Sequence, residues 1–310
     1  MEELTLFGGE EYKYIFLEQQ KKSLNDKFLI PPFSIFDTKQ GYWQDRKQKW
    51  KNLGIRSEIG RDKNLTYNMG LNYTNDIHDN EYTTSIFDPV LCEIAYKWFN
   101  IQNGKILDPF SGGSVRGIVA NTLGYDYLGI DLSERQIEEN YKNANELKCE
   151  MDKLKWINDD STNIDNYVDD NSVDMIFTCP PYYDLEVYSD KKNDLSNMSF
   201  EDFEINYTLI LQKTFRKLKN NRFGIVVIGD VRDKKGNYRN LIDLTKKAIC
   251  NNEIGFYNDI ILLNSISSAS LRAESQFKAS RKVVKIHQNV LVFYKGNIKE
   301  IKNNYNKIKI

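Results

Sequence analysis

The sequence has few of the residues from which metal sites and disulfide frameworks are built. Its 310 residues include only two histidines and four cysteines, and no two cysteines form a CxxC pair. Structural zinc sites need closely spaced cysteines and histidines, and disulfide frameworks need paired cysteines at short spacings. We therefore expect neither a metal site nor a disulfide framework. The cysteines are Cys92, Cys149, Cys179 and Cys250.

Long apolar runs are also missing. A helix that crosses a bilayer needs roughly 18 or more consecutive apolar residues, and no stretch of this chain approaches that length. The chain begins Met1-Glu2-Glu3, whereas a secretory leader begins with positive charge. Because 40% of the residues are apolar, the chain can bury one sizeable core or two small ones. We expect a cytoplasmic globular protein with no membrane contact.

Charge is nearly balanced overall but unevenly distributed. The formal net charge is -1, yet residues 158–204 hold thirteen acidic residues against two lysines. Residues 260–310 reverse this pattern, with ten Lys or Arg against two Glu. Such a basic region is either a solvated face with a basic tail or a surface that contacts phosphates.

Residues 105–114, KILDPFSGGS, predict the centre of the fold. An apolar strand ends at Asp108 and breaks into Gly112 and Gly113, and residues 115–123 follow with the pattern of a helix. A second predicted strand, residues 127–131, ends at Asp131 about twenty residues after the turn. This order is typical of a doubly wound α/β fold that binds a nucleotide-like ligand at its strand ends.

The two carboxylates narrow the choice of ligand. Asp131 has the position of a residue that accepts hydrogen bonds from ribose hydroxyls. Asp108 lies within the turn, where its charge would repel a pyrophosphate such as that of NAD or ATP. A ligand with an adenosine and a cationic portion fits better, and S-adenosylmethionine has both.

A second distinctive stretch is residues 172–183, SVDMIFTCPPYY. A buried strand here ends in Pro180 and Pro181, which cannot continue a sheet ladder because proline lacks a backbone N–H. The chain must leave as a stiff turn whose carbonyls can accept hydrogen bonds from an amino group. The aromatic rings that follow could stack on a base, or they could pack into the core of a rigid turn.

Together the two stretches resemble the amino-group DNA methyltransferases, which methylate adenine N6 or cytosine N4. The resemblance covers residues 87–295 and implies a Rossmann-like class I methyltransferase fold, with a mostly parallel seven-stranded sheet, an antiparallel last strand and flanking helices. The cofactor half precedes the catalytic half, as in the permuted members of the family. More loosely, the whole chain is similar to methylase-like proteins of phages and mobile elements, which implies a role in DNA modification or restriction-modification.

The resemblance also implies roles for individual residues. The cofactor would be lined by Asp108, Pro109, Phe110, Gly112, Gly113, Asp131, Leu132 and Asp160. The catalytic residues at the flipped target base would be Cys179, Pro180, Pro181 and Tyr182. Further substrate contacts would come from Tyr183, Arg272, Lys278, Arg281 and Lys282.

Two positions depart from the family pattern. Cys179 stands where the family has Asp, Asn or Ser, whose side chain accepts from the target amine. Because a thiol is a weak acceptor, the carbonyl of Pro180 would do more of the orienting. The choice between adenine and cytosine stays open, with cysteine nearest to the serine of cytosine-N4 enzymes. Ser114 replaces the usual third glycine, which a helix N-terminus accommodates.

The predicted chemistry is direct methyl transfer to a base turned out of the duplex. Accepting the two amine hydrogens at Cys179 and the Pro180 carbonyl would aim the nitrogen lone pair at the sulfonium methyl. Flipping the base costs a few kcal/mol, part of which stacking on Tyr182 or Tyr183 recovers. No cysteine nucleophile is required.

We expect three segments. Residues 1–85 form an irregular arm rich in aromatics and cations, which either contacts DNA or packs its rings on the main domain. Residues 86–296 form the catalytic domain, with a basic loop at residues 265–286 that we expect to contact phosphates. Residues 297–310 form a basic tail. Residues 184–190 are expected to form an acidic loop over the site. Arg232 is expected either to make structural ion pairs, which we favour, or to touch substrate.

No large target-recognition domain is evident, so a homodimer or a separate specificity partner is a further expectation. Two other functions remain open. An RNA or protein methyltransferase can share the cofactor turn and a PPY motif, and a non-catalytic nucleic-acid-binding relative would lack cofactor binding.

Overall fold

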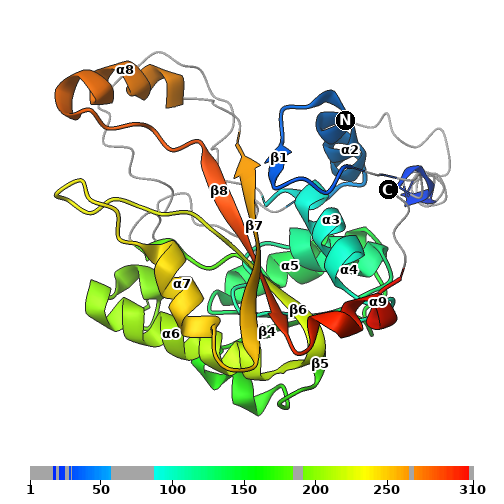
Figure 1. The fold of residues 1–310 in the computed structure, drawn as a ribbon. Helices are drawn as coiled ribbons and strands as arrows, with labels where there is room; N and C mark the ends of the chain where they lie inside the picture. Colours follow the sequence, from blue (N-terminus) through cyan, green and yellow to red (C-terminus); the bar gives the residue numbers. More distant parts are fainter. Residues whose placement is uncertain are drawn as a thin grey trace.

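One mixed β-sheet runs through the middle of the protein (Figure 1). The computed structural model describes residues 17–18, 21–24, 28, 30–56, 87–183, 191–264 and 269–306. Within them the sheet has eight strands in the order β1-β7-β8-β6-β5-β2-β3-β4. The strands are β1 (Ile35–Asp37), β2 (Lys105–Asp108), β3 (Asp126–Asp131), β4 (Leu154–Asn158), β5 (Val173–Thr178), β6 (Leu218–Ile228), β7 (Ile254–Leu263) and β8 (His287–Lys295).

The strand directions confirm the predicted Rossmann-like class. Strand β8 runs antiparallel to both of its neighbours, β6 and β7, while the other pairs in the sheet are parallel. From β2 the chain winds outward to β3 and β4 on one side, and then returns to β5 and β6 on the other. The order therefore reverses between β2 and β5, which is where open α/β sheets bind ligands.

The sheet has eight strands rather than the seven expected. The extra strand is β1, whose Ile35 and Asp37 pair with Ile261 and Leu263 of β7. This pairing covers the edge of β7 that would otherwise carry unpaired backbone groups.

Helices cover both faces of the sheet and create two cores. Residues on α2 to α5 pack on one face with Ile106 and Phe177, whereas residues on α6 and α7 pack on the other with Leu107 and Ile176. Successive strand residues thus point to opposite cores, as the pleat requires. The helices are α2 (Gly41–Asn52), α3 (Pro89–Phe99), α4 (Val115–Thr122), α5 (Glu134–Glu146), α6 (Phe200–Arg216), α7 (Leu241–Ile249), α8 (Ala269–Ser280) and α9 (Ile301–Asn304), with short 3-10 turns η1 (Ser161–Asn166), η3 (Leu195–Asn197) and η4 (Ile298–Glu300).

Two helices begin at side-chain caps of residue types that favour helix starts, Asp88 for α3 and Ser133 for α5. The Asp88 carboxylate accepts from the backbone N–H of Val90 at 2.9 Å, with Pro89 in the first helical turn. The Ser133 hydroxyl accepts from the backbone N–H of Gln136 at 3.2 Å and begins α5. Each cap satisfies a backbone donor that the first turn leaves without a helical partner.

The described part of the N-terminal segment is ordered structure rather than the irregular arm expected. Trp43 and Trp50 of α2 are fully buried, and Arg46 pairs with the buried Glu93 of α3 at 2.7 Å. Trp50 donates its indole N–H to the same carboxylate at 2.8 Å. Of the two alternatives for this segment, packing on the main domain holds for these rings.

The C-terminal segments also differ from the expectation. Most of the expected loop at residues 265–286 is helix α8, with residues 265–268 outside the described part of the chain. The expected tail continues as α9, after which Tyr305 packs on Phe223 with ring centroids 5.2 Å apart. The predicted acidic loop at residues 184–190 and residues 57–85 of the expected arm also lie outside the description. No helix in the described ranges is long and apolar enough to span a membrane.

Candidate cofactor and substrate site

The two stretches singled out from the sequence lie side by side at one edge of the sheet. Strands β2 and β5 are direct neighbours, with Ile106 opposite Met175 and Leu107 opposite Ile176. Because the strands are parallel, the turn after Asp108 and the turn after Thr178 leave from the same edge. The ends of β3, β4 and β6 reach this edge too, so it collects the polar ends of five strands.

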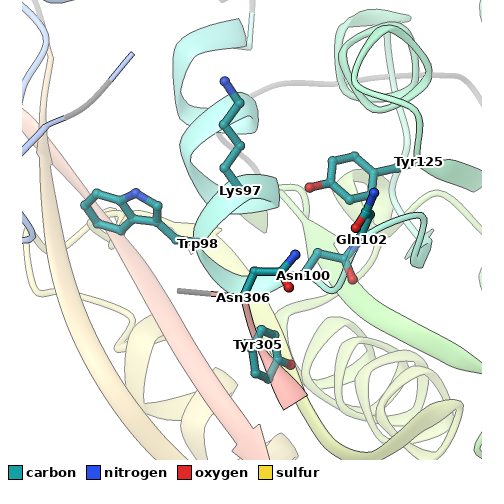
Figure 2. Close-up of a pocket in the computed structure, with 7 residues that line it drawn as sticks. All are labelled: Lys97, Trp98, Asn100, Gln102, Tyr125, Tyr305 and Asn306. Carbon is teal, nitrogen blue, oxygen red and sulfur yellow. The ribbon is translucent and has the colours of Figure 1, made fainter. Parts of the chain in front are cut away.

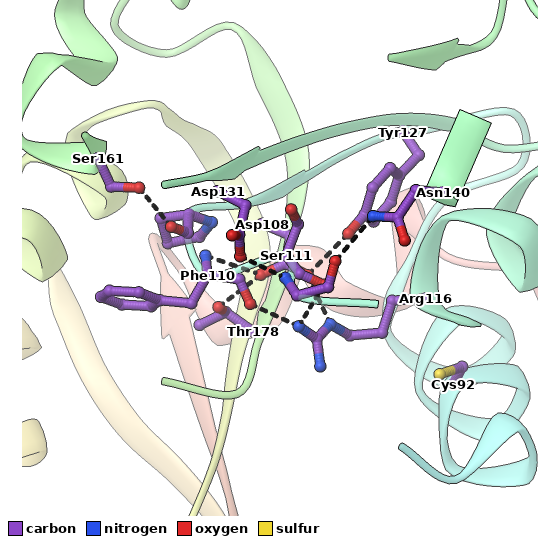
Figure 3. Close-up of polar contacts among 12 residues, drawn as sticks. Cys92, Asp108, Phe110, Ser111, Arg116, Tyr127, Asp131, Asn140, Ser161 and Thr178 are labelled. Carbon is purple, nitrogen blue, oxygen red and sulfur yellow. Dashed lines mark hydrogen bonds and ion pairs between the residues drawn. The ribbon is translucent and has the colours of Figure 1, made fainter. Parts of the chain in front are cut away.

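Asp108 joins these two strands below the turn (Figure 3). Its side chain is fully buried, and one carboxylate oxygen accepts from the Thr178 hydroxyl at 2.6 Å. The other oxygen accepts from the Tyr127 hydroxyl at 2.8 Å and from Nε of Arg116 at 2.5 Å. The carboxylate is therefore engaged within the protein, and it holds the turn from beneath instead of facing the open edge.

Arg116 is the second half of this buried pair. It lies in the first turn of α4 and is 5% exposed. Its guanidinium donates to the carbonyls of Phe110 and Ser111, and it lies 4.6 Å over the ring of Phe87. Burial would lower the pKa of Arg116, but Asp108, Tyr127 and Cys179 together outweigh burial and raise this pKa, with Asp108 the largest of the three. Arg116 thus stays charged and fixes two carbonyls of the turn.

The glycine turn is shaped to meet Asp131 at the end of β3. Gly112 has a φ of +49°, a conformation that glycine adopts without a Cβ penalty. Its N–H donates to the Asp131 carboxylate at 2.8 Å, and the N–H of Ser133 donates to the other oxygen at 2.9 Å. Asn140 of α5 donates to the carbonyl of Gly112 at 2.7 Å. Burial raises the pKa of Asp131, while the two N–H donors oppose that rise.

Asp160 and Leu132 complete the cofactor side. The Asp160 carboxylate accepts from the N–H of Thr162 at 2.8 Å and from the Asn193 amide at 2.9 Å. The carbonyl of Leu132 accepts from Nζ of Lys191 at 2.6 Å. Ser161, which follows Asp160, donates its hydroxyl to the carbonyl of Pro109 and so connects the segment after β4 to the glycine turn.

The chain leaves the end of β5 through the double proline, and β6 is the neighbouring strand. Pro180 is buried, whereas Cys179, Pro181 and Tyr182 are partly exposed at the edge. The ring of Tyr182 lies over Gly229, where an added Cβ would come within 3.1 Å of the ring. The Tyr182 hydroxyl lies 3.8 Å from Sγ of Cys179. Glycine after β6 therefore makes room for the ring that would meet a base.

Tyr183 has a different environment from Tyr182. Its φ is +57°, and its ring packs edge-on against Phe200 and Phe203, with centroids 5.2 Å away in both cases. The guanidinium of Arg239 covers the same ring at 4.5 Å. These contacts place Tyr183 in a structural aromatic cluster, so Tyr182 is the better placed of the two rings for stacking on a substrate.

The residues at this edge fit S-adenosylmethionine. Asp131 is partly exposed at the strand end, and each of its oxygens keeps an acceptor position beyond its one backbone donor. Ser111, inside the turn, has a buried hydroxyl oxygen with no hydrogen-bond partner in the described structure. Phe110 lies partly exposed in the same turn, with its ring stacked near Tyr207. The strand end and the turn thus offer a carboxylate and an apolar ring to one ligand, whereas the Ser111 side chain is fully buried against Gly129 of β3.

The basic residues predicted to bind substrate lie on and after α8. No described residue of α8 is buried. Lys278 and Arg281 are exposed, and Arg272 and Lys282 are partly exposed. Figure 1 shows α8 projecting beyond the sheet, between the ends of β7 and β8. The end of β7 belongs to the same edge as the two turns, so the structure brings these cations to that edge.

The pocket in Figure 2 lies at the opposite edge of the sheet. It has a volume of about 140 Å³ and opens beside the start of β2. The pocket is therefore separate from the two turns. Its lining residues are Lys97, Trp98, Asn100, Gln102, Tyr125, Tyr305 and Asn306. The described residues contain no group of three or more His, Cys, Asp or Glu side chains that could hold a metal ion.

Arg116, Tyr127 and Thr178 shape the site but were not predicted from the sequence. Arg116 carried a usable signal, because a cation in the first turn of a helix opposes the helix dipole. Such a residue needs a nearby carboxylate, and Asp108 supplies it.

The sequence was also compared with protein families and with curated proteins. A family model described as Conserved hypothetical protein 95, a methyltransferase family, matches residues 85–226. A search of curated proteins finds no match.

Solved structures resemble the fold at low identity. TrmN from Thermus thermophilus is 14% identical, with 67% of this chain and 49% of TrmN covered and a TM-score of 0.47. This chain thus spans about half the length of TrmN. A candidate rRNA methylase from Clostridium thermocellum is 14% identical, with 69% of this chain and 99% of the methylase covered and a TM-score of 0.45. A candidate DNA modification methylase from Thermus thermophilus is 16% identical, with 48% of this chain and 53% of the methylase covered and a TM-score of 0.34.

The family match and the site geometry together support the cofactor and the reaction class expected from the sequence. S-adenosylmethionine is the cofactor of such methyltransferases.

Proposed function

We propose that this protein is an S-adenosylmethionine-dependent DNA methyltransferase that methylates an exocyclic base amine, adenine N6 or cytosine N4. One observation supports this most directly. The hydrogen bond from Thr178 to Asp108, at 2.6 Å, couples the cofactor turn to the strand that ends in Cys179-Pro180-Pro181-Tyr182. A cofactor on one turn and a base on the next would therefore lie within reach of each other.

The cofactor half would act by holding and orienting. Asp131 accepts the ribose hydroxyls, and Asp160 lies on the next strand end, toward the adenine. The turn from Asp108 to Gly113, held by Arg116, receives the methionine portion. When bound, S-adenosylmethionine supplies an electrophilic methyl group on a sulfonium.

The Pro-Pro-Tyr half would orient the amine. The carbonyl of Pro180 and the side chain of Cys179 accept its two hydrogens, which turns the nitrogen lone pair toward the methyl group. With S-adenosylmethionine bound, the amine held in this way would exchange one N–H bond for the new N–C bond while the S–C bond broke, and the proton would pass to water. Tyr182 stacks on the flipped base and recovers part of the cost of flipping.

The cations Arg272, Lys278, Arg281 and Lys282 would contact the DNA backbone, which positions the duplex without reading its sequence. Exposed residues of the N-terminal segment are a second DNA contact in this proposal. Sequence preference would come from a homodimer or a separate specificity partner. In biological terms we propose a modification enzyme of the type carried by phages and mobile elements.

Incubation with S-adenosylmethionine and unmodified DNA, followed by nucleoside mass spectrometry, tests the proposal. We expect N6-methyladenine or N4-methylcytosine in the wild-type reaction, and about 10- to 100-fold slower formation of the same product with Tyr182→Ala. Parallel reactions with RNA and with protein separate the alternative substrates. The absence of both methylated bases across varied DNA sequences would exclude the DNA function, and methyl transfer to RNA or protein alone would reassign the substrate.

A further inference from the structure

Two segments at the site edge concentrate positive charge. Residues 231–240, between β6 and α7, and residues 269–286, from α8 to the start of β8, together hold nine Lys or Arg. They hold only two acidic residues, Asp233 and Glu274, in a chain with 43 basic and 44 acidic residues. This surface, named here the basic edge, is therefore distinct from the rest of the protein.

The two segments touch one another. The ring of Tyr238 lies 4.0 Å from the Arg232 guanidinium of its own segment and 6.0 Å from Nζ of Lys285 of the other. Lys282 also lies against the turn at Gly236, where an added Cβ would be 2.7 Å from Cε of that lysine. The segments are separated by 28 residues of sequence, residues 241–268, and these contacts make them one surface.

The basic edge reaches the Pro-Pro-Tyr turn through Arg239. Its guanidinium lies 4.5 Å over the ring of Tyr183 and 4.4 Å over Phe200. Because Tyr183 follows Tyr182 directly, a ligand held along this surface would pass next to the position proposed for the target base.

The acidic residues within the basic edge do not neutralise it. Asp233 accepts from the backbone N–H of Asn237 and so stabilises its own turn. Glu274 pairs with Lys278 one helical turn away. Lys234 and Lys235 are both exposed, so their ammonium groups are presented to a partner.

Helix α8 adds a second reason to expect a partner. Its twelve residues include none that is buried, and Leu271 is 83% exposed. An isolated helix of this length is marginal in water because its nucleation is costly. Contact with a partner would supply the stabilisation that the body of the protein does not.

We propose that the basic edge binds the sugar-phosphate backbone of duplex DNA beside the target base, with residues 231–240 as a second binding segment in addition to α8. This inference rests on the proposed DNA function. It assigns a ligand-facing role to Lys234, Lys235 and Arg232. In the structure Arg232 contacts the ring of Tyr238 and donates to the Gly236 carbonyl at 2.7 Å, in place of the expected ion pairs. Phosphate contacts of this kind release counterions and make affinity fall with salt.

The test compares two charge-matched double variants of the full chain. Lys234→Ala/Lys235→Ala removes two exposed cations from the basic edge, whereas Lys299→Ala/Lys302→Ala removes two exposed cations beyond the other end of β8. Fluorescence anisotropy with a labelled 20-base-pair duplex, over a salt series, gives the dissociation constant and its salt slope. We expect the first variant to reduce the slope by about 2, at roughly one unit per lysine, and the second to leave it unchanged.

The outcomes separate this inference from the proposed function. Equal slopes for the two variants and the wild type, or an equal loss in both variants, would overturn the basic edge as a binding surface even if the enzyme methylates DNA. Salt-dependent duplex binding that falls only in Lys234→Ala/Lys235→Ala would support the surface even if mass spectrometry finds no methylated base. Calorimetry with S-adenosylmethionine confirms that both variants remain folded.

Discussion

Asp131 offers the sharpest test of the cofactor site. Its carboxylate oxygens each accept one backbone N–H, from Gly112 and from Ser133, and each retains a position for a ribose hydroxyl. A hydrogen bond to a charged group contributes about 1.5–3 kcal/mol. Two such bonds at the lower value give about 3 kcal/mol, so Asp131→Ala should weaken S-adenosylmethionine binding about 100-fold.

Calorimetric titration of the purified protein measures this change. Asp126→Ala is the matched control, because Asp126 is an exposed carboxylate at the other end of the same strand. We expect the control to bind the cofactor as the wild type does. Asp131→Asn keeps one acceptor oxygen and should lose about 10-fold, between the other two.

The raised pKa of Asp131 adds a pH dependence with a definite sign. Burial raises this pKa above the ordinary value of 3.8, and only the ionised carboxylate accepts from two hydroxyls and two N–H groups. Cofactor affinity should therefore decline on acidification, starting above the pH at which an ordinary aspartate is protonated. Asp131→Asn should lack this decline. Wild-type affinity for the cofactor in Asp131→Ala would refute the assignment of the ribose site.

Three further substitutions test other parts of the structure. Tyr182→Ala should leave the cofactor dissociation constant within about twofold and lower kcat about 10- to 100-fold, because one base stack contributes about 1–3 kcal/mol; equal loss of cofactor binding would contradict the two-site assignment. Gly229→Ala should displace the Tyr182 ring and lower kcat in the same manner, with no change in calorimetric cofactor binding. Glu93→Gln should cost about 3 kcal/mol of unfolding free energy in urea at neutral pH, since it leaves the buried Arg46 without its partner. Burial opposes ionisation of Glu93, but Arg46 and Lys97 lower its pKa below 4.5. The stabilisation that the ionised carboxylate provides is therefore complete above pH 4.5 and is lost as the pH falls through the lowered pKa. The unfolding free energies of the variant and the wild type should converge at that pH.

The parallel core was predictable because its signals are local. Apolar runs end at Asp108, Asp131 and Thr178, and each is followed by residues that stop a strand. Asp88 and Ser133 marked helix starts because capping needs only the next two or three residues. The order of the motifs along the chain then fixed which strands would be neighbours, once a doubly wound fold was assumed.

The segments at the two ends were harder to predict because their structure depends on distant partners. β1 has only three residues, and it is a strand because Ile261 to Leu263 are available to pair with it. Trp43 and Trp50 lie on a helix with many charges, and their indole N–H groups donate to Asp88 and Glu93, each more than forty residues away. α8 has a weak apolar pattern and buries none of its side chains, so nothing in its sequence distinguished it from a loop.

The role of Asp108 changes once its neighbours are known. In the sequence it stands as a lone charge inside the ligand turn, which disfavours a pyrophosphate. In the structure Arg116 compensates that charge at 2.5 Å, and the carboxylate is fully buried. Repulsion by Asp108 is therefore too weak to select the ligand. We propose that selection for adenosine falls instead to Asp131, whose carboxylate accepts from two backbone N–H groups and keeps acceptor positions at the open edge. The position of Asp108 between Thr178 and Arg116 makes it the joint between the two binding turns, so its loss should disturb both at once.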